Sequence, residues 1–322
     1  SQKTHIPVTK ITEKEGDKLL KLEDMMHKRM VDQEGAVKSI ASSLRRARAE
    51  FRDTKRPIAN FLFLGPTGVG KTECAKTVAD VYFGDESNMI RVDMSEYQEK
   101  NSIGRLIGAP PAPGGATVGG YLTEAVRKNP FSLILFDEIE KAYTDILTIF
   151  LQVMDDGRLT DATGRTIDFT QTIIIMTSNA GTQYIQDEVK KGTSVEQIKT
   201  RLLETELKQY FRPEFLNRFD NISVFRPLSM DHVKQIARLM LQKTGKQLED
   251  KGVEFEVTEN AINELASEGF DPLFGARPLR RVIQENVNNL LANSVISGKL
   301  HRRDKVILVS SNKIDIVKGR EL

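Results

Sequence analysis

The residues with the clearest chemical signature form one glycine-rich run. Gly65-Pro66-Thr67-Gly68-Val69-Gly70-Lys71-Thr72 matches G-x-x-x-x-G-K-[ST] without a mismatch, directly after the apolar run 61–64 and before the helical pattern 73–82. Glycines let backbone N–H groups turn inward around phosphate oxygens, and the following helix adds its N-terminal dipole. Lys71 would neutralise β- and γ-phosphate charge, and the Thr72 hydroxyl would ligate Mg²⁺. The flanking strand and helix favour a phosphate site over a chance glycine turn.

Polar side chains follow two further apolar runs. Asp137 and Glu138 end the run 133–136, and Asn179 follows the run 172–177. Asp137 would hold the water shell of the metal, and Glu138 would polarise an attacking water. Asn179 would orient that water or sense the γ-phosphate, because open α/β sheets bind ligands at this edge. Alone, the acids could be a solvated strand terminus and Asn179 an ordinary turn residue.

Two segments imitate the guanine-reading motifs of GTPases. Asn312-Lys313-Ile314-Asp315 spells N-K-x-D, and Asp161-Ala162-Thr163-Gly164 spells D-x-x-G. The first lies between the strand-like runs 306–309 and 314–317, so it is predicted to be a hairpin turn far from the phosphate loop. The metal-linked acid is better supplied by Asp137. The sequence therefore favours ATP over GTP.

The elements that must position these residues follow from apolar periodicity. Short buried runs at 61–64, 90–92, 133–136 and 173–177 alternate with helical patterns, which predicts a parallel sheet flanked by helices. The stretch 19–51 predicts one or two amphipathic helices. After Pro227 the sequence becomes helix-rich, with two late strand-like runs. We expect an N-terminal linker and helices over 1–55, a large α/β unit over 56–226 and a smaller helix-rich α+β unit over 227–322.

Within the smaller unit, a long helix is expected from Pro278 to a stop at Gly298. Its buried stripe is expected to consist of apolar residues at helical spacing: Leu279, Val282, Ile283, Val287, Leu290, Leu291 and Val295.

Composition excludes several classes of protein. The 322 residues carry 47 Lys+Arg against 45 Asp+Glu, a net charge of +2, so no global field attracts nucleic acid or an anionic membrane. The single cysteine, Cys74, cannot form an intrachain disulfide, and four scattered histidines offer no metal cage. No signal peptide is visible, and no apolar run approaches the ~20 residues of a membrane span. We expect a soluble, cytoplasmic protein with neither nucleic-acid nor membrane partners.

Taken together, the chain resembles the second, C-terminal ATPase module of the Clp-type AAA+ unfoldases and disaggregases, and most closely the ClpB-like branch. The resemblance covers nearly the whole chain. Besides the phosphate loop it is carried by Arg56-Pro57-Ile58, Arg91-Val92-Asp93-Met94-Ser95-Glu96-Tyr97, Gly120-Tyr121-Leu122-Thr123-Glu124-Ala125-Val126, Asp155-Asp156-Gly157-Arg158-Leu159-Thr160-Asp161, Phe211-Arg212-Pro213-Glu214-Phe215-Leu216-Asn217-Arg218 and Gly275-Ala276-Arg277-Pro278-Leu279.

That resemblance implies a three-layer P-loop AAA+ fold with a small lid, and it assigns further residues. Arg218 matches the arginine finger, which reaches the γ-phosphate held by a neighbouring subunit. Arg277 matches the sensor arginine of the lid, which contacts phosphates within its own chain. Val31 and Asp32 lie in the segment that resembles the adenine-contacting turn. The implied activity is ATP hydrolysis coupled to remodelling, unfolding or disaggregation of proteins in a homo-oligomeric, hexameric ring whose assembly can depend on nucleotide.

Two departures keep other functions open. In the loop 108–120, Pro113 stands where related modules carry a tyrosine that grips the translocating polypeptide. A nucleotide-gated ring-assembly module without threading of its own is therefore one alternative. A second is the ATPase partner of a ClpP-type peptidase, disfavoured because 180–210 lacks the docking tripeptide. A third, a DNA-acting AAA+ protein, is disfavoured because the only cluster of basic residues is scattered around one helix: Arg45, Arg46, Arg48 and Arg52.

Overall fold

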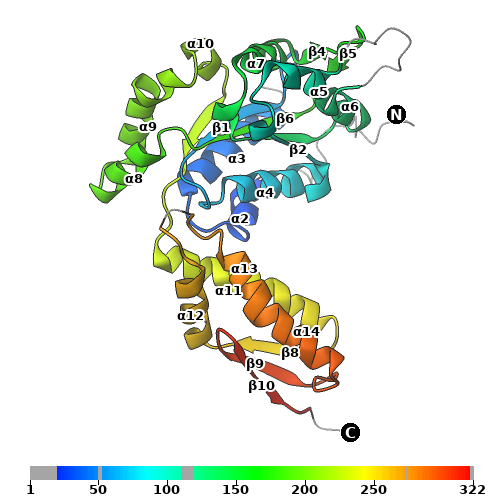
Figure 1. Ribbon diagram of the computed structural model, residues 1–322, viewed down its shortest axis with the longest axis vertical. Helices are drawn as coiled ribbons and strands as arrows, with labels where there is room; N and C mark the ends of the chain where they lie inside the picture. The colour runs from blue at the N-terminus through cyan, green and yellow to red at the C-terminus, as the bar shows by residue number, and fades with distance from the viewer. Residues whose placement is uncertain (1–19, 50–52, 110–118, 273, 320–322) are drawn as a thin grey trace. The chain divides into compact units, whose positions relative to one another are not determined.

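The protein is described by a computed structural model that covers residues 20–49, 53–109, 119–272 and 274–319. The chain divides into two compact units (Figure 1). The larger comprises 1–65 and 70–226, and the smaller comprises Pro66–Val69 together with Pro227–Leu322. Each unit is considered by itself.

A five-stranded parallel sheet forms the centre of the larger unit, in the order β2-β3-β6-β1-β7. Four of its strands are the predicted apolar runs, and β7 is an edge strand that periodicity did not predict. A separate antiparallel hairpin consists of β4 and β5. The strands of this unit are β1 (Ala59–Leu64), β2 (Met89–Asp93), β3 (Leu133–Asp137), β4 (Arg158–Thr160), β5 (Thr166–Asp168), β6 (Ile173–Ser178) and β7 (Asn221–Val224).

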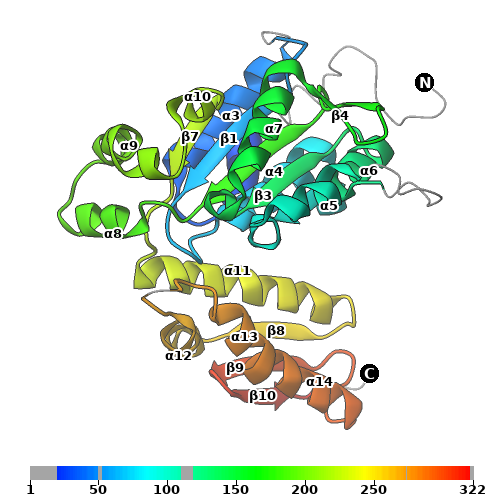
Figure 2. The same cartoon turned by 45° about the horizontal axis from the view of Figure 1, so that its top comes forward.

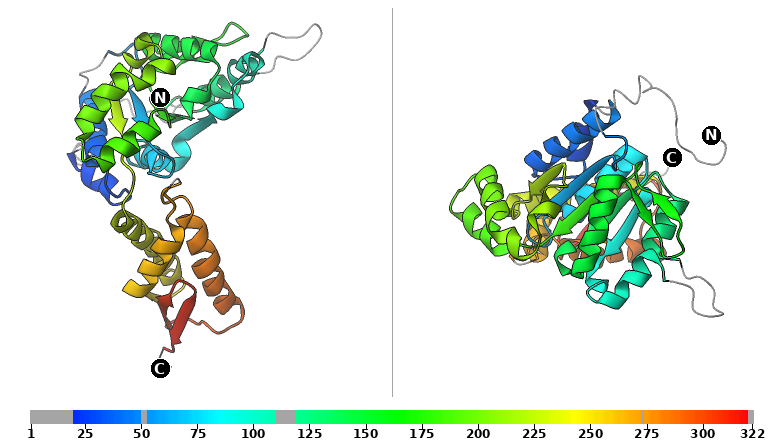
Figure 3. Two further views of the ribbon diagram at one scale, coloured as in Figure 1. Left: turned by 60° about the vertical axis from the view of Figure 1, so that its left-hand side comes forward. Right: turned by 90° about the horizontal axis from the view of Figure 1, so that it is seen from above.

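Helices cover both faces of this sheet and complete three layers (Figure 2). Helices α3 and α4 contact one face, and α6 and α7 cover the other. The edge strand β7 is contacted by both α3 and α9 (Figure 3). The α-helices of the unit are α2 (Leu22–His27), α3 (Glu34–Arg48), α4 (Lys71–Phe83), α5 (Ile103–Ile107), α6 (Tyr121–Lys128), α7 (Thr144–Asp156), α8 (Thr182–Lys190), α9 (Val195–Glu204) and α10 (Pro213–Leu216). The 3₁₀ turns are η1 (Glu86–Asn88), η2 (Met94–Glu96), η3 (Lys100–Ser102), η4 (Ile139–Lys141) and η5 (Glu206–Gln209).

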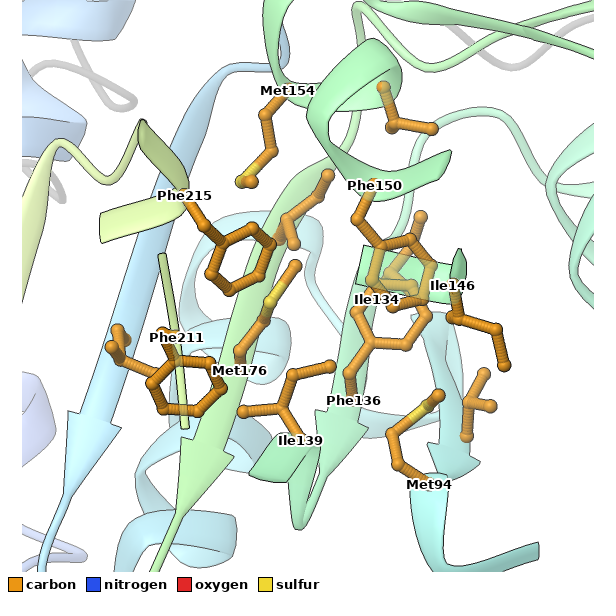
Figure 4. Close-up of a cluster of buried hydrophobic side chains, with 14 of the residues drawn as sticks. Met94, Ile134, Phe136, Ile139, Ile146, Phe150, Met154, Met176, Phe211 and Phe215 are labelled. Carbon is orange, nitrogen blue, oxygen red and sulfur yellow. The ribbon is translucent and has the colours of Figure 1, made fainter. Parts of the chain in front are cut away.

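A cluster of buried hydrophobic side chains lies between the sheet and α7 (Figure 4). The rings of Phe136 on β3 and Phe150 on α7 lie 4.2 Å apart between centroids, and Phe215 of α10 packs 5.7 Å from Phe211. Burying one such aromatic side chain contributes about 2–3 kcal/mol of transfer free energy. The cluster therefore fixes the strands whose carboxyl ends carry the polar residues singled out by the sequence.

The smaller unit is an α+β domain. Helices α11 and α12 contact a three-stranded sheet of order β10-β9-β8, in which β8 is parallel and β10 antiparallel to β9. Ser229 caps α11 through a reciprocal capping box with His232. The elements are α11 (Met230–Glu249), β8 (Glu254–Val257), α12 (Glu259–Gly269), α13 (Leu279–Ile283), the π-helical segment η6 (Gln284–Asn288), α14 (Asn289–Ile296), β9 (Lys305–Ser310) and β10 (Lys313–Val317).

One helix of this unit differs from its prediction. The expected continuous helix after Pro278 is interrupted by η6, whose wider turn departs from the 3.6-residue repeat on which the predicted stripe was based. Leu279, Ile283, Val287 and Leu291 are buried as expected, whereas Val295 is 37% exposed. The predicted hairpin at 312 is present, because β9 and β10 flank Ser311 and Asn312.

Two further observations bear on the sequence predictions. The part of the loop 108–120 that contains Pro113 lies outside the described residues. Across the described ranges, no helix combines the length and the apolar character that crossing a lipid bilayer requires.

Candidate functional site

Parallel pairing brings the polar residues to one edge of the sheet. Leu64 of β1 pairs with Ser178 of β6, and Phe136 of β3 pairs with Met176 of β6. The strands therefore end together, so Gly65, the acids after β3 and Asn179 after β6 share the carboxyl edge. The Gly65 N–H donates to the Ser178 carbonyl at 3.2 Å. This is the edge at which open α/β sheets bind ligands.

Lys71 is the most buried charged group at this edge. It begins α4, is only 8% exposed, and donates to the Asn179 Oδ1 at 2.9 Å and to the Gly65 carbonyl. Desolvation lowers the pKa of Lys71 to about 8, although the carboxylates of Glu140, Asp137 and Glu138 oppose this shift. Burial of this ammonium carries a desolvation cost, which an anionic ligand would reduce.

This depressed pKa predicts a pH-dependent stability. The unfolded chain keeps a lysine pKa of 10.5, so between pH 8 and 10.5 it binds more protons at Lys71 than the folded chain does. The free energy of unfolding of the nucleotide-free protein should therefore rise with pH across this window, by roughly 3 kcal/mol at most. Urea unfolding at several pH values, in parallel with Lys71→Met, measures the difference. Identical pH dependences in the two proteins would contradict the assignment.

The two acids after β3 are held by cations of their own chain. The Asp137 Oδ2 lies 2.7 Å from an Nη2 of Arg91 on β2, and its Oδ1 accepts from the Thr177 hydroxyl. The Glu138 carboxylate forms an ion pair with Lys141. Glu138 also has a φ of 57°, in the left-handed region that costs a non-glycine residue about 1 kcal/mol or more. Such strain is found where surrounding structure holds a residue in place for function.

The loop between β1 and α4 offers room and donors for phosphate. Gly65 has a φ of 149°, and a Cβ there would lie 2.5 Å from the Phe225 carbonyl oxygen, so only glycine fits. Gly70 has a φ of 104° and open space beside it, and as the N-cap of α4 it makes no side-chain cap hydrogen bond. The N–H groups at a helix N-terminus suit an anion. Thr72 is half-buried in the first turn of the same helix.

The donor set is compatible with Mg²⁺ held jointly by protein and phosphate. Among the described residues there is no group of three or more His, Cys, Asp or Glu side chains that could hold a metal on its own. The oxygen donors of Thr72 and Asp137 are hard ligands, which Mg²⁺ prefers, and Mg²⁺ usually completes its shell with waters and phosphate oxygens. The residues present therefore fit this ion with a triphosphate.

Asn179 is fixed by a neighbouring acid that sequence reasoning did not select. Its N–H donates to the Glu140 Oε1 at 3.0 Å, and its carbonyl accepts the Thr182 N–H at 3.2 Å. The side-chain oxygen is thereby directed at Lys71. Glu140 thus helps to fix the backbone that carries the Asn179 side chain.

The turn that contains Val31 and Asp32 is held by the last residue of the larger unit. Asp32 and Gln33 have φ values of 60° and 62°, both left-handed. The Gln33 amide donates to the Arg226 carbonyl at 3.0 Å and accepts the Arg226 N–H at 3.1 Å, while the Asp32 carboxylate pairs with the Arg226 guanidinium. These bonds offset the strain of two consecutive left-handed residues.

The two arginines assigned by resemblance lie in different units. Arg218 belongs to the larger unit, follows α10, and its Nε lies 3.0 Å from the Asp155 Oδ2. Arg277 belongs to the smaller unit and precedes α13. The smaller unit also includes the phosphate-loop residues Pro66–Val69. Within this unit the Ala276 N–H donates to the Gly68 carbonyl.

Several residues of the site were not foreseen from the sequence. Arg91 and Lys141 pair with the acids, and Gln33 and Glu140 position other site residues. Arg29 contacts Asp80 at 2.9 Å and Glu73 at 3.2 Å, and so ties the α2–α3 turn to α4. Of these residues, only Lys141 could have been predicted from spacing along the chain, because it follows Glu138 by three residues and such pairs often form ion pairs. The others depend on contacts between distant segments.

The fold and this edge define a P-loop nucleotide-binding module, with a phosphate loop after β1, acids after β3 and an amide after β6. Comparison with known proteins agrees. The family model described as AAA domain (Cdc48 subfamily) matches residues 56–222, and the one described as the C-terminal, D2-small domain of ClpB protein matches residues 228–308.

Individual relatives point the same way. Chaperone protein ClpB of Aquifex aeolicus is 54% identical over 93% of this chain and 30% of its own length. The ATP-dependent Clp protease ATP-binding subunit ClpC of Staphylococcus epidermidis is 51% identical over 92% of this chain and 37% of its own length. A closed-state cryo-EM reconstruction of Hsp104 with ATPγS and FITC casein superposes with a TM-score of 0.84 at 37% identity, covering 97% of this chain and 54% of that one.

The chain belongs to the AAA family of ATPase domains, as a ClpB-like second ATPase module of the Clp AAA+ proteins. It spans about a third of the length of the curated relatives that it matches.

Proposed function

We propose that this chain hydrolyses ATP with Mg²⁺ and couples hydrolysis to the remodelling, unfolding or disaggregation of protein substrates within a homo-oligomeric ring. The observation that carries the proposal is the convergence of Lys71, the Asp137–Glu138 pair and Asn179 at one sheet edge. The relatives named as ClpB chaperones support the substrate class. The ring is proposed to be a hexamer whose assembly responds to nucleotide.

In this proposal the chain's own residues divide the work. Lys71 and the loop N–H groups bind the phosphates, with Gly65, Pro66, Thr67, Gly68, Val69 and Gly70 forming the loop. Thr72 and Asp137 would hold Mg²⁺, which supplies charge neutralisation at the phosphates. Glu138 leaves Lys141 and takes a proton from the attacking water, which Asn179 orients. Arg218 of one subunit acts on the neighbour's phosphate, Arg277 contacts phosphate within its own chain, and Val31 and Asp32 contact adenine.

Two measurements test this proposal. ATP turnover is compared with and without an unfolded protein, and the mass of the particle is compared with and without ATP. We expect turnover that responds to the unfolded protein, together with a nucleotide-dependent increase in mass. Turnover that never responds would contradict the remodelling function for this chain, and a constant monomer mass would contradict the ring.

A ring-assembly module that binds nucleotide without threading substrate is a second candidate. It is favoured by Pro113, which replaces the gripping tyrosine of related modules in a segment outside the described residues. This candidate predicts ring formation with ATP but no stimulation by unfolded protein. The leading proposal of an ATP-driven remodelling module also includes a cytoplasmic location and the absence of nucleic-acid partners.

Coupling to a ClpP-type peptidase is a third candidate, since ClpC subunits are also about half identical to this chain. The segment 180–210 that would carry a docking tripeptide forms α8, α9 and η5 and contains none. We therefore propose that such a peptidase is not a partner. Protein degradation on mixing the two would contradict this.

A further inference from the structure

One arginine outside the phosphate site joins the two segments that hold Arg218. The Arg56 Nε donates to the Met154 carbonyl at 2.9 Å, in the last turn of α7, and its Nη2 donates to the Arg218 carbonyl at 3.0 Å. Both acceptors are backbone atoms, so the bonds fix where the chain runs and not merely where a side chain points. A planar guanidinium can serve two acceptors in this way, whereas an ammonium cannot do so with fixed geometry.

The Arg218 side chain is anchored on the same pair of segments. Its Nε pairs with the Asp155 Oδ2 at 3.0 Å, and Asp155 directly follows the Met154 that Arg56 binds. The Arg218 side chain nevertheless remains 45% exposed. Its backbone is therefore held by a bond within the subunit, while nearly half of its side-chain surface is open to solvent.

The segment that carries Arg56 is itself fixed. The Ile58 N–H donates to the Thr172 carbonyl at 2.8 Å. At Gly157, which ends α7 with a φ of 58°, a Cβ would lie 2.3 Å from the Lys55 carbonyl oxygen, so the two segments approach as closely as glycine permits. Arg56 thus projects from a rigid base.

The chain after Arg218 returns to this base. The Asp220 N–H donates to the Asn60 carbonyl at 2.9 Å, and the Asn60 N–H donates to the Asp220 Oδ2 at 2.7 Å. Arg218 and Asp220 are therefore both bonded to the segment 56–60, which leads into β1.

We propose that Arg56 is a positioning residue for Arg218, holding the loop from which Arg218 reaches the nucleotide of a neighbouring subunit. The inference rests on the proposed trans role of Arg218. Without Arg56, the Met154 and Arg218 carbonyls lose a shared donor and the loop gains freedom. Displacement of a catalytic cation by about 1 Å can cost up to 100-fold in rate, so Arg56→Ala should lower turnover at least about tenfold. ATP affinity should not change.

The test uses mixtures of variants of this 322-residue chain. A Glu138→Gln subunit cannot turn over at its own site yet still presents Arg218. An Arg56→Ala subunit has an intact site of its own but presents Arg218 poorly. In an equimolar mixture, half of the ATP sites belong to Arg56→Ala subunits and retain Glu138. About half of those sites face a Glu138→Gln subunit, which presents Arg218 correctly. Turnover should therefore recover to about one quarter of the parent value. A role confined to folding would give no such recovery.

Three further measurements on variants accompany this test. Arg218→Ala mixed with Glu138→Gln must also recover if Arg218 acts in trans. Arg56→Lys retains the charge and should show a smaller loss, which guards against a folding defect in Arg56→Ala. Arg46→Ala is the matched control, because Arg46 borders the same surface cavity of about 250 Å³, and among the described residues its side chain bonds to Ser42 and Ser43 of its own helix. Its turnover should equal that of the parent.

Each outcome has one meaning. Recovery in both mixtures, with Arg46→Ala unaffected, supports the positioning role. Recovery with Arg218→Ala but not with Arg56→Ala overturns it while leaving the proposed function intact. If neither mixture recovers, Arg218 does not act in trans and the inference fails with that part of the proposed function. An equal loss in Arg46→Ala also overturns it, because general charge at the cavity would then explain the effect.

Discussion

Glu138→Gln is expected to bind ATP as tightly as the parent chain while its turnover falls by about 10²- to 10⁴-fold, the usual contribution of a positioned general base. The amide keeps the size of the side chain but loses the negative charge, and with it the ability to accept a proton and the ion pair with Lys141. The affinity for ATP should be unchanged, because Lys71, and not Glu138, is directed at the phosphate loop. Single-turnover hydrolysis and equilibrium binding of a fluorescent nucleotide give the two numbers.

The neighbouring acid provides the control for this experiment. Glu140→Gln retains a carbonyl acceptor for the Asn179 N–H and should keep most of its turnover. Glu138→Gln with turnover within about twofold of the parent would remove Glu138 from the role of base. Equal losses in both variants would point instead to the local negative charge.

Lys71→Ala is expected to lose ATP binding itself. Removing one partner of a buried charged contact costs about 2–5 kcal/mol, which corresponds to a rise in Kd of at least ~30-fold. Lys71 is buried and already poised between Gly65 and Asn179, so the ligand gains a preorganised cation. Isothermal titration with ATP and Mg²⁺ measures the loss.

Lys76→Ala is a matched control in the same helix. The Lys76 Nζ lies 3.9 Å from the Glu73 Oε2 in a partly exposed pair on the same helix. Its affinity for ATP should therefore be that of the parent. Comparable losses in the two variants would indicate that damage to α4, and not the missing ammonium, abolishes binding.

The sequence could specify those parts of the fold in which a local pattern coincides with burial. Strands β1, β3 and β6 are buried because helices cover both faces of the sheet, and their sequences are largely apolar. Each was predicted from its apolar run. Strand β7, Asn221–Val224, alternates polar and apolar residues at the sheet edge and is only four residues long, so it lacked this signal. The three-residue strands β4 and β5 were too short to give one.

The same distinction applies to the site. Lys71, Asp137, Glu138 and Asn179 follow strands, and parallel pairing alone brings them together. Arg91 reaches Asp137 from the adjacent strand, and no spacing along the chain announces this contact. The bond from Arg56 to the Arg218 carbonyl is equally invisible, because a side-chain contact with backbone leaves no trace in the identity of the accepting residue.

Strand β1 has one further consequence, for symmetry. Its six residues span about 20 Å, with the phosphate loop after Leu64 and the anchor of Arg218 before Ala59. If Arg218 acts on a neighbour's nucleotide as proposed, each subunit would accept at one end of β1 and donate at the other. A two-fold dimer could pair them only through a patch that contains both ends, whereas a head-to-tail contact needs one end from each subunit. An open row of such contacts would leave one acceptor without a donor, and closure into a ring would supply it.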